Sequence, residues 1–192
     1  MTKFDQLTEV IKRRRSIFPA SYTGEKLSDD IIISILENAN WAPSHRKTEP
    51  WRFIIFKEGG LQSLSNYLAS YYEKNTPTDK FSELKLKKTK QKALQSSHVI
   101  AICMQRDPEE RVPEWEELAA VSMAVQNMWL SCSALDLGCY WSSPKSMIEA
   151  SDFLELRDGE SCLGIFYIGV PKEGVQLSSS RNPLSDKLRW IS

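Results

Sequence analysis

The chain has 192 residues, of which 41% are hydrophobic, and its 25 Lys and Arg residues balance its 25 Asp and Glu residues. This length and composition indicate one globular domain, residues 1–192, with a substantial core. The balanced charge argues against nucleic acid or an anionic membrane as the main partner.

The chain also lacks the signals of export and of metal binding. No apolar run reaches the roughly 18 to 20 residues that cross a bilayer, and the N-terminus is charged where a signal peptide is apolar. The cysteines have no CxxC spacing and have apolar neighbours, which indicates reduced core thiols: Cys103, Cys132, Cys139 and Cys162. With two histidines and no ligand-spaced cluster we expect no metal site. These features favour a cytoplasmic protein.

The first element is a short amphipathic helix followed by cations. Phe4, Leu7 and Ile11 recur at helical spacing, and "KRRRS" follows at residues 12–16. The arginines are then expected in the last helical turn, where cations complement unpaired carbonyls. One interpretation is a solvated helix end. The other is an anion site, because guanidinium groups match phosphate oxygens in bidentate geometry.

A second helix is predicted before residue 43. Ser28 is a candidate N-cap, Leu27 can pack onto Ile32, and Pro43 stops the helix. Its buried stripe is expected to be Ile32, Ile35, Leu36 and Ala39.

The middle of the chain alternates irregularly between strands and helices. Strands are predicted at 51–56, 98–104 and 162–170, with a short strand and turn at 138–144. A helix carries Leu61, Leu64, Leu68 and Tyr71. The basic segment "KLKKTKQK" at 85–92 is interpreted as a solvated helical face or a surface flap. This order is typical of an α+β fold.

The segment 114–137 is apolar on every side of a predicted helix. A helix of this kind must be covered all round, and one small domain covers one face well. We therefore expect a second subunit on the other face.

The candidate chemistry lies in three loops: the arginine cluster with Ser16, "APSHRKTEPW" (42–51) and "YWSSP" (140–144). The sequence has no GxSxG, HExxH, GxxxxGK[ST] or GxGxxG motif. Each loop combines hydrogen-bonding groups with a flat aromatic side chain, although any one Trp also suits a core position. Flavin mononucleotide (FMN) needs a cationic phosphate pocket, an apolar slab and directional polar groups.

These motifs and "CLGIFYIGVPK" follow one another in the order found in the nitroreductase family, and the resemblance spans almost the whole chain. The chain most resembles the short bacterial members of that family. The resemblance implies an α+β three-layer sandwich, with a central mixed sheet flanked by helices and the long helix buried at a homodimer interface. It also implies two FMN sites between the subunits, reduced by NADH or NADPH and reoxidised by nitro compounds, quinones or similar flat acceptors.

Several site residues are implied by the same resemblance. Arg14, Arg15 and Ser16 match the residues that hold the phosphate and ribityl chain of FMN. Trp41 stands where the other subunit contacts FMN, and His45 matches a flavin contact or is a loop-capping residue.

The remaining implied residues lie in the second half of the chain. Trp141, Ser142 and Ser143 match the turn along the flavin ring, and Arg181 stands where a second phosphate-binding arginine is common. Ser142 replaces a frequent arginine, which leaves open how the chain contacts the nicotinamide or the acceptor at that edge.

A second departure concerns the position two residues after Ser16. It is Phe18 here, where relatives carry a cation that stabilises charge on the reduced ring. A flavin-binding regulatory or storage module with little turnover is therefore the alternative to an enzyme.

Overall fold

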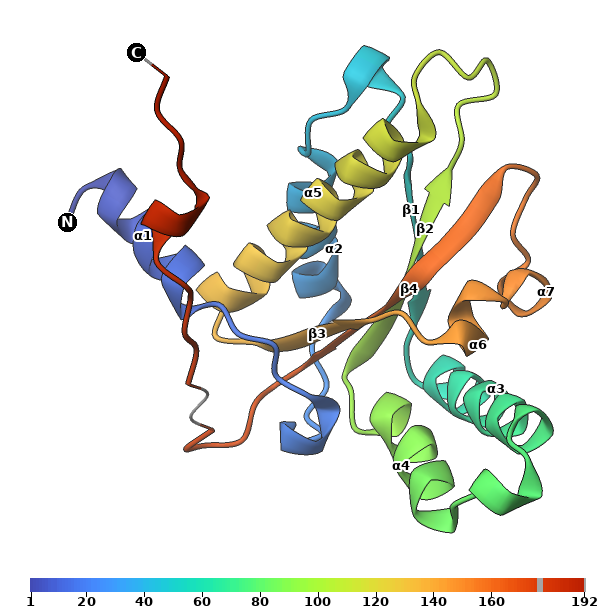
Figure 1. The fold of residues 1–192 in the computed structure, drawn as a ribbon. Helices are drawn as coiled ribbons and strands as arrows, with labels where there is room; N and C mark the ends of the chain where they lie inside the picture. The colour runs from blue at the N-terminus through green and yellow to red at the C-terminus, as the bar shows by residue number, and fades with distance from the viewer. Residues whose placement is uncertain (176–177, 192) are drawn as a thin grey trace.

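The computed structural model describes residues 1–175 and 178–191, in which four strands form one sheet between two layers of helices (Figure 1). The strand order is β1, β2, β4, β3. Their bounds are Trp51–Phe56 for β1, His98–Gln105 for β2, Gly138–Ser142 for β3 and Glu160–Gly169 for β4. The expected α+β three-layer fold is confirmed.

The expectation of a mixed sheet is wrong for the described strands, because all three ladders are antiparallel. Strands β2 and β3 run in the same direction and are joined through a long helix, which would normally give a parallel pair. Strand β4 lies between them and runs against both. The parallel crossover is therefore present without parallel pairing.

Helices cover both faces of the sheet. Helices α2 (Asp29–Asn40) and α5 (Glu114–Ala134) pack on one face. The other face carries α3 (Gly59–Asn75), α4 (Glu83–Leu94), α6 (Lys145–Ile148) and α7 (Ser151–Leu154). Alternate residues of β2 enter the two cores, Ile100 and Ile102 on one side and Val99 and Ala101 on the other. This explains why β2 reads as a continuous apolar run.

Short 3₁₀ turns lie between these elements at η1 (Pro19–Ser21), η2 (His45–Lys47) and η3 (Thr78–Lys80), and η4 (Leu184–Lys187) follows β4. The four cysteines are buried and unpaired, as expected for core thiols. Within the described part of the chain, no helix combines the length and the apolar character needed to cross a bilayer.

Helix α1 (Lys3–Arg13) is capped by Thr2 and Asp5, whose side chains and backbone amides hydrogen-bond reciprocally. It ends at Arg13, so Arg14 and Arg15 lie after the helix and not in its last turn. Its apolar stripe is exposed: Phe4, Leu7 and Ile11.

Helix α5 also leaves apolar side chains uncovered, as its all-round apolar pattern predicts. Val121, Ala124 and Met128 are buried against the sheet. On the outer side, the exposed residues are Trp115, Leu118, Met123 and Leu135. A single chain therefore covers one face of this helix only.

Candidate functional site

The arginine segment runs beside β3, the edge strand of the sheet. The Ile17 amide donates to the Cys139 carbonyl at 2.9 Å, and the Tyr22 hydroxyl donates to the Ile17 carbonyl at 2.7 Å. The Tyr22 ring lies on Gly138 and Gly169, where a Cβ would approach ring atoms to 2.6 and 2.4 Å. These two glycines let the tyrosine lie against the strands and anchor the segment that follows α1.

Arg14 points inward from this segment. Its guanidinium carbon lies 4.7 Å from the centroid of the Trp129 ring, a cation–π contact from α5. Its Nη1 atom is buried and has no hydrogen-bond partner among the described residues. A buried guanidinium donor without an acceptor is costly, which indicates a place for an anionic ligand.

The side chains that follow Arg14 in the chain make other contacts. Arg15 folds back on the helix end, where its Nη1 donates to the carbonyls of Lys12 at 2.6 Å and Arg14 at 2.9 Å. Ser16 is half-buried. Phe18 packs on Tyr140 with 4.4 Å between ring centroids and is half exposed.

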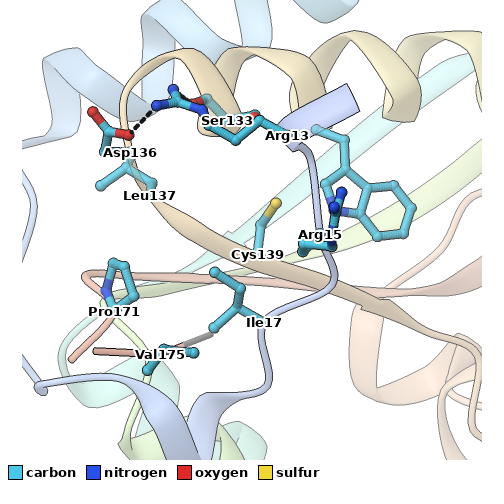
Figure 2. A pocket seen from close by; sticks show the side chains of 10 residues that line it. Arg13, Arg15, Ile17, Ser133, Asp136, Leu137, Cys139, Pro171 and Val175 are labelled. Carbon is cyan, nitrogen blue, oxygen red and sulfur yellow. Dashed lines mark hydrogen bonds and ion pairs between the residues drawn. The ribbon is translucent and has the colours of Figure 1, made fainter. Parts of the chain in front are cut away.

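A cavity of about 400 Å³ opens where α1, the end of α5 and β3 meet (Figure 2). Arg13 and Arg15 provide cationic walls, and Ile17 and Leu137 provide apolar ones. Arg13 pairs with Asp136 at 3.0 Å between Nη1 and Oδ1 and donates from Nη2 to a carbonyl of α5 at 2.7 Å. The volume is in the range of pockets for cofactors. The cavity combines apolar surface with a cationic rim.

Cys139 and Trp129 also line this cavity, and neither was among the residues implied by the sequence. Burial raises the pKa of the Cys139 thiol well above its usual value, so this group stays protonated. Trp129 was predicted as one apolar residue of the long helix. The apolar pattern does not distinguish Trp129 from the other apolar residues of the helix. The role of Trp129 depends on Arg14, whose guanidinium group lies over its ring.

The turn after β3 is held close to β4. Trp141 lies opposite Phe166 in the ladder, and Trp129 packs edge-on against the same Phe166 at 5.7 Å between centroids. Gly164 has a φ of +128°, and a Cβ there would approach the Ser142 carbonyl oxygen to 2.3 Å. The glycine therefore permits this close approach.

The aromatic packing brings Arg14 and Trp141 to one part of the molecule. The Trp141 Nε1 atom is buried without a hydrogen-bond partner in the described residues. Ser142 is half-buried and Ser143 is exposed at the end of the strand.

The other predicted residues lie elsewhere in the single chain. His45 contacts Glu116 at the start of α5, with 2.6 Å between Nδ1 and Oε2, whereas Arg13 contacts Ser133 at the end of the same helix. At 1.5 Å per residue these two contacts are about 25 Å apart. His45 is thus not brought to Arg14 within one chain. Trp41, the C-cap of α2, is 86% exposed.

Among the residues that the structure describes, Arg181 hydrogen-bonds only to its neighbours in the chain. Its Nη1 donates to the Ser179 hydroxyl and the Ser180 carbonyl, both at 2.8 Å.

Comparison with known proteins identifies the family. The model of the nitroreductase family matches residues 11–170, from the end of α1 to the end of β4. The chain belongs to the nitroreductase family. The expected family is thereby confirmed.

Several nitroreductase relatives cover nearly the whole chain. A Bacillus subtilis protein named "Putative NAD(P)H nitroreductase YfhC" is 32% identical over 94% of this chain and 92% of its own length. A nitroreductase-like protein from Bacillus cereus has a TM-score of 0.80 and 26% identity, with 100% of this chain and 98% of that chain covered. The crystal structure of a "putative nitroreductase in complex with fmn" from Desulfovibrio desulfuricans has a TM-score of 0.72 and 27% identity, covering 97% and 96%.

Proposed function

We propose that this nitroreductase-family chain is an FMN-dependent oxidoreductase that takes electrons from NADH or NADPH, with residues 1–192 as one FMN-binding domain of a homodimer. The family, the FMN in a similar solved structure and the NAD(P)H in the name of a relative support this assignment. The four unpaired thiols are consistent with action in the cytoplasm.

The observation that carries the proposal is the buried, unpartnered Nη1 of Arg14. An anionic phosphate is the partner that a guanidinium group prefers, and Ser16 is two residues away to donate a further hydrogen bond. Trp141 supplies a second buried donor at its indole nitrogen and an aromatic surface. The residues present therefore fit FMN, with Arg14, Arg15 and Ser16 toward its phosphate and Trp141, Ser142 and Ser143 toward its ring.

Bound FMN would supply two-electron chemistry, accepting hydride at N5 from the nicotinamide and passing electrons in a second half-reaction to nitro compounds, quinones or similar flat acceptors. The protein residues bind and orient the reactants. Phe18 places a ring where relatives have a cation, so charge on a reduced ligand must be stabilised by N–H donors, by Arg15 or by His45.

The second subunit is part of the proposed site. His45 lies about 25 Å from the arginine segment along α5, a separation that one chain cannot close. The exposed apolar side chains of α1 and α5 supply a surface for a partner. In a homodimer, the loop at 41–45 of one subunit can then meet the Arg14 segment of the other.

Anaerobic reduction tests the function. We expect the purified protein to be yellow with an FMN spectrum, and the flavin to bleach within seconds on mixing with NADH or NADPH. A flavin that stays oxidised with both donors supports the alternative module with little turnover. A protein that remains colourless after incubation with FMN contradicts the assignment.

A further inference from the structure

The first turn of α5 carries three acidic residues, Glu114, Glu116 and Glu117, and two of them hold other segments of the chain. Glu117 is fully buried, pairs with Arg106 and accepts a hydrogen bond from the Asp107 amide at 2.9 Å. These contacts fix the start of α5 against the loop that follows β2. Glu116, one residue earlier, is therefore carried on a rigid helix end.

Glu116 holds His45, which lies in the loop that follows α2. Its Oε2 atom lies 2.6 Å from Nδ1 of His45. The Glu116 side chain is 24% exposed and that of His45 is 59% exposed, so the carboxylate is the anchored member of the pair and the ring reaches outward. Ion pairs at the surface contribute little to stability. The main consequence of this contact is the orientation of the ring.

The loop that carries His45 has a strained backbone. Arg46, Lys47 and Glu49 have φ angles of +53°, +55° and +43°, a left-handed conformation that is unfavourable for residues other than glycine. Within the loop, the Thr48 amide donates to the His45 carbonyl at 3.3 Å. The contact with α5 ties this strained segment to a helix.

The same contact determines which nitrogen of the imidazole ring is left for a ligand. An ionised carboxylate only accepts hydrogen bonds, so Nδ1 of His45 carries a proton and donates to Glu116. Across residues 1–175 and 178–191, Nε2 of His45 has no hydrogen-bond partner. Nε2 is therefore the atom with which His45 can reach a ligand.

The pair lies beside the surface that the proposed function gives to the second subunit. Trp115 and Leu118, in the same stretch of α5, are 67% and 43% exposed. A partner subunit that covers these apolar side chains also comes next to the His45 ring.

We propose that Glu116 is a positioning residue for the FMN site of the partner subunit, holding the His45 ring with Nδ1–H toward its carboxylate and Nε2 toward the flavin. This inference rests on the proposed function, in which His45 of one subunit meets the Arg14 segment of the other. Phe18 replaces the cation of relatives, and His45 is one of the groups that can act in its place. A ring that Glu116 already orients loses less rotational freedom when the flavin binds.

The test is a double-mutant cycle on FMN affinity. The apoprotein is titrated with FMN by fluorescence quenching for the wild type, Glu116→Ala, His45→Ala and the double variant. Glu114→Ala is the control, because it removes the same charge from the same helical turn. We expect Glu116→Ala to raise the Kd about three- to tenfold, the loss of one hydrogen bond, and to have no further effect in the His45→Ala background.

A conservative variant separates positioning from charge. Glu116→Gln keeps an oxygen that can accept from Nδ1, so it should recover most of the affinity, and Glu114→Ala should bind FMN like the wild type. Additive losses in the double variant would overturn the inference, since Glu116 would then act through α5 and not through the ring. An unchanged Kd in Glu116→Ala, or an equal loss in Glu114→Ala, would also overturn it.

The nitrogen chemical shifts of the His45 ring give a readout that does not depend on FMN. At alkaline pH we expect the neutral ring to carry its proton on Nδ1 in the wild type and in Glu116→Gln, and to lose this preference in Glu116→Ala. A wild-type ring protonated on Nε2 would overturn the inference. A wild-type protein that does not bind FMN contradicts the proposed function instead, and the ring spectrum then decides the contact with Glu116 by itself.

Discussion

Replacement of Arg14 by Met tests the proposed phosphate anchor. The change removes the guanidinium group and keeps an unbranched side chain that can lie on Trp129 through its sulfur. A charge-assisted hydrogen bond contributes about 1.5–3 kcal/mol, and the buried Nη1 of Arg14 has no partner among the described residues. Losing one such bond to FMN predicts binding about 10- to 150-fold weaker.

The fold should tolerate this change. The cation–π contact with Trp129 contributes about 0.5–1 kcal/mol at a half-exposed position, and the methionine sulfur recovers part of it. The assay is titration of the apoprotein with FMN, followed by quenching of flavin fluorescence, beside thermal unfolding of the same apoprotein. Lys12→Gln removes a charge from the exposed end of α1 and is the control. An Arg14→Met protein that is folded and binds FMN like the control would refute the reasoning.

Three further changes test other parts of the account. Leu118→Glu puts a charge on the exposed face of α5 and should give monomers by light scattering, whereas a stable dimer would remove this helix from the interface. Arg106→Met leaves the fully buried Glu117 without its cation and should lower the free energy of unfolding, measured in urea, by about 3 kcal/mol. The double variant Arg106→Met/Glu117→Leu should restore part of this loss. An unchanged free energy of unfolding in Arg106→Met would contradict the pairing. Burial lowers the pKa of His98, so only the unfolded state gains a proton there as pH falls below about 6.5, and stability should drop by up to about 1.4 kcal/mol per pH unit. His98→Asn should flatten this slope between pH 7 and 5, and an unchanged slope would exclude His98 as its source.

Local pattern predicted much of the fold because each element carries its own signal. The strand predicted at 51–56 has those bounds in the structure. Its β-rich sequence begins at Trp51 and stops before Lys57 and the glycines that open α3. Helix α4 was harder to define because five of its 12 residues are lysines and its buried residues are only Leu86 and Ala93.

Side-chain placement in the site depends on contacts that the sequence does not encode locally. Arg14 and Trp129 are more than a hundred residues apart, and their contact exists because α1 ends against the last turns of α5. The separation of His45 from Arg14 follows from the length of α5 and becomes visible only once both ends of that helix have their neighbours. The sequence placed Arg14 and His45 in one type of site, whereas the single chain places them at opposite ends of one helix.

A crystal structure of the protein grown with excess FMN tests the central claim most directly. The account predicts the FMN phosphate within hydrogen-bonding distance of Arg14 and Ser16, with Trp41 and His45 of the second subunit beside the same flavin. A phosphate bound far from Arg14, or a flavin enclosed by one subunit alone, would contradict it.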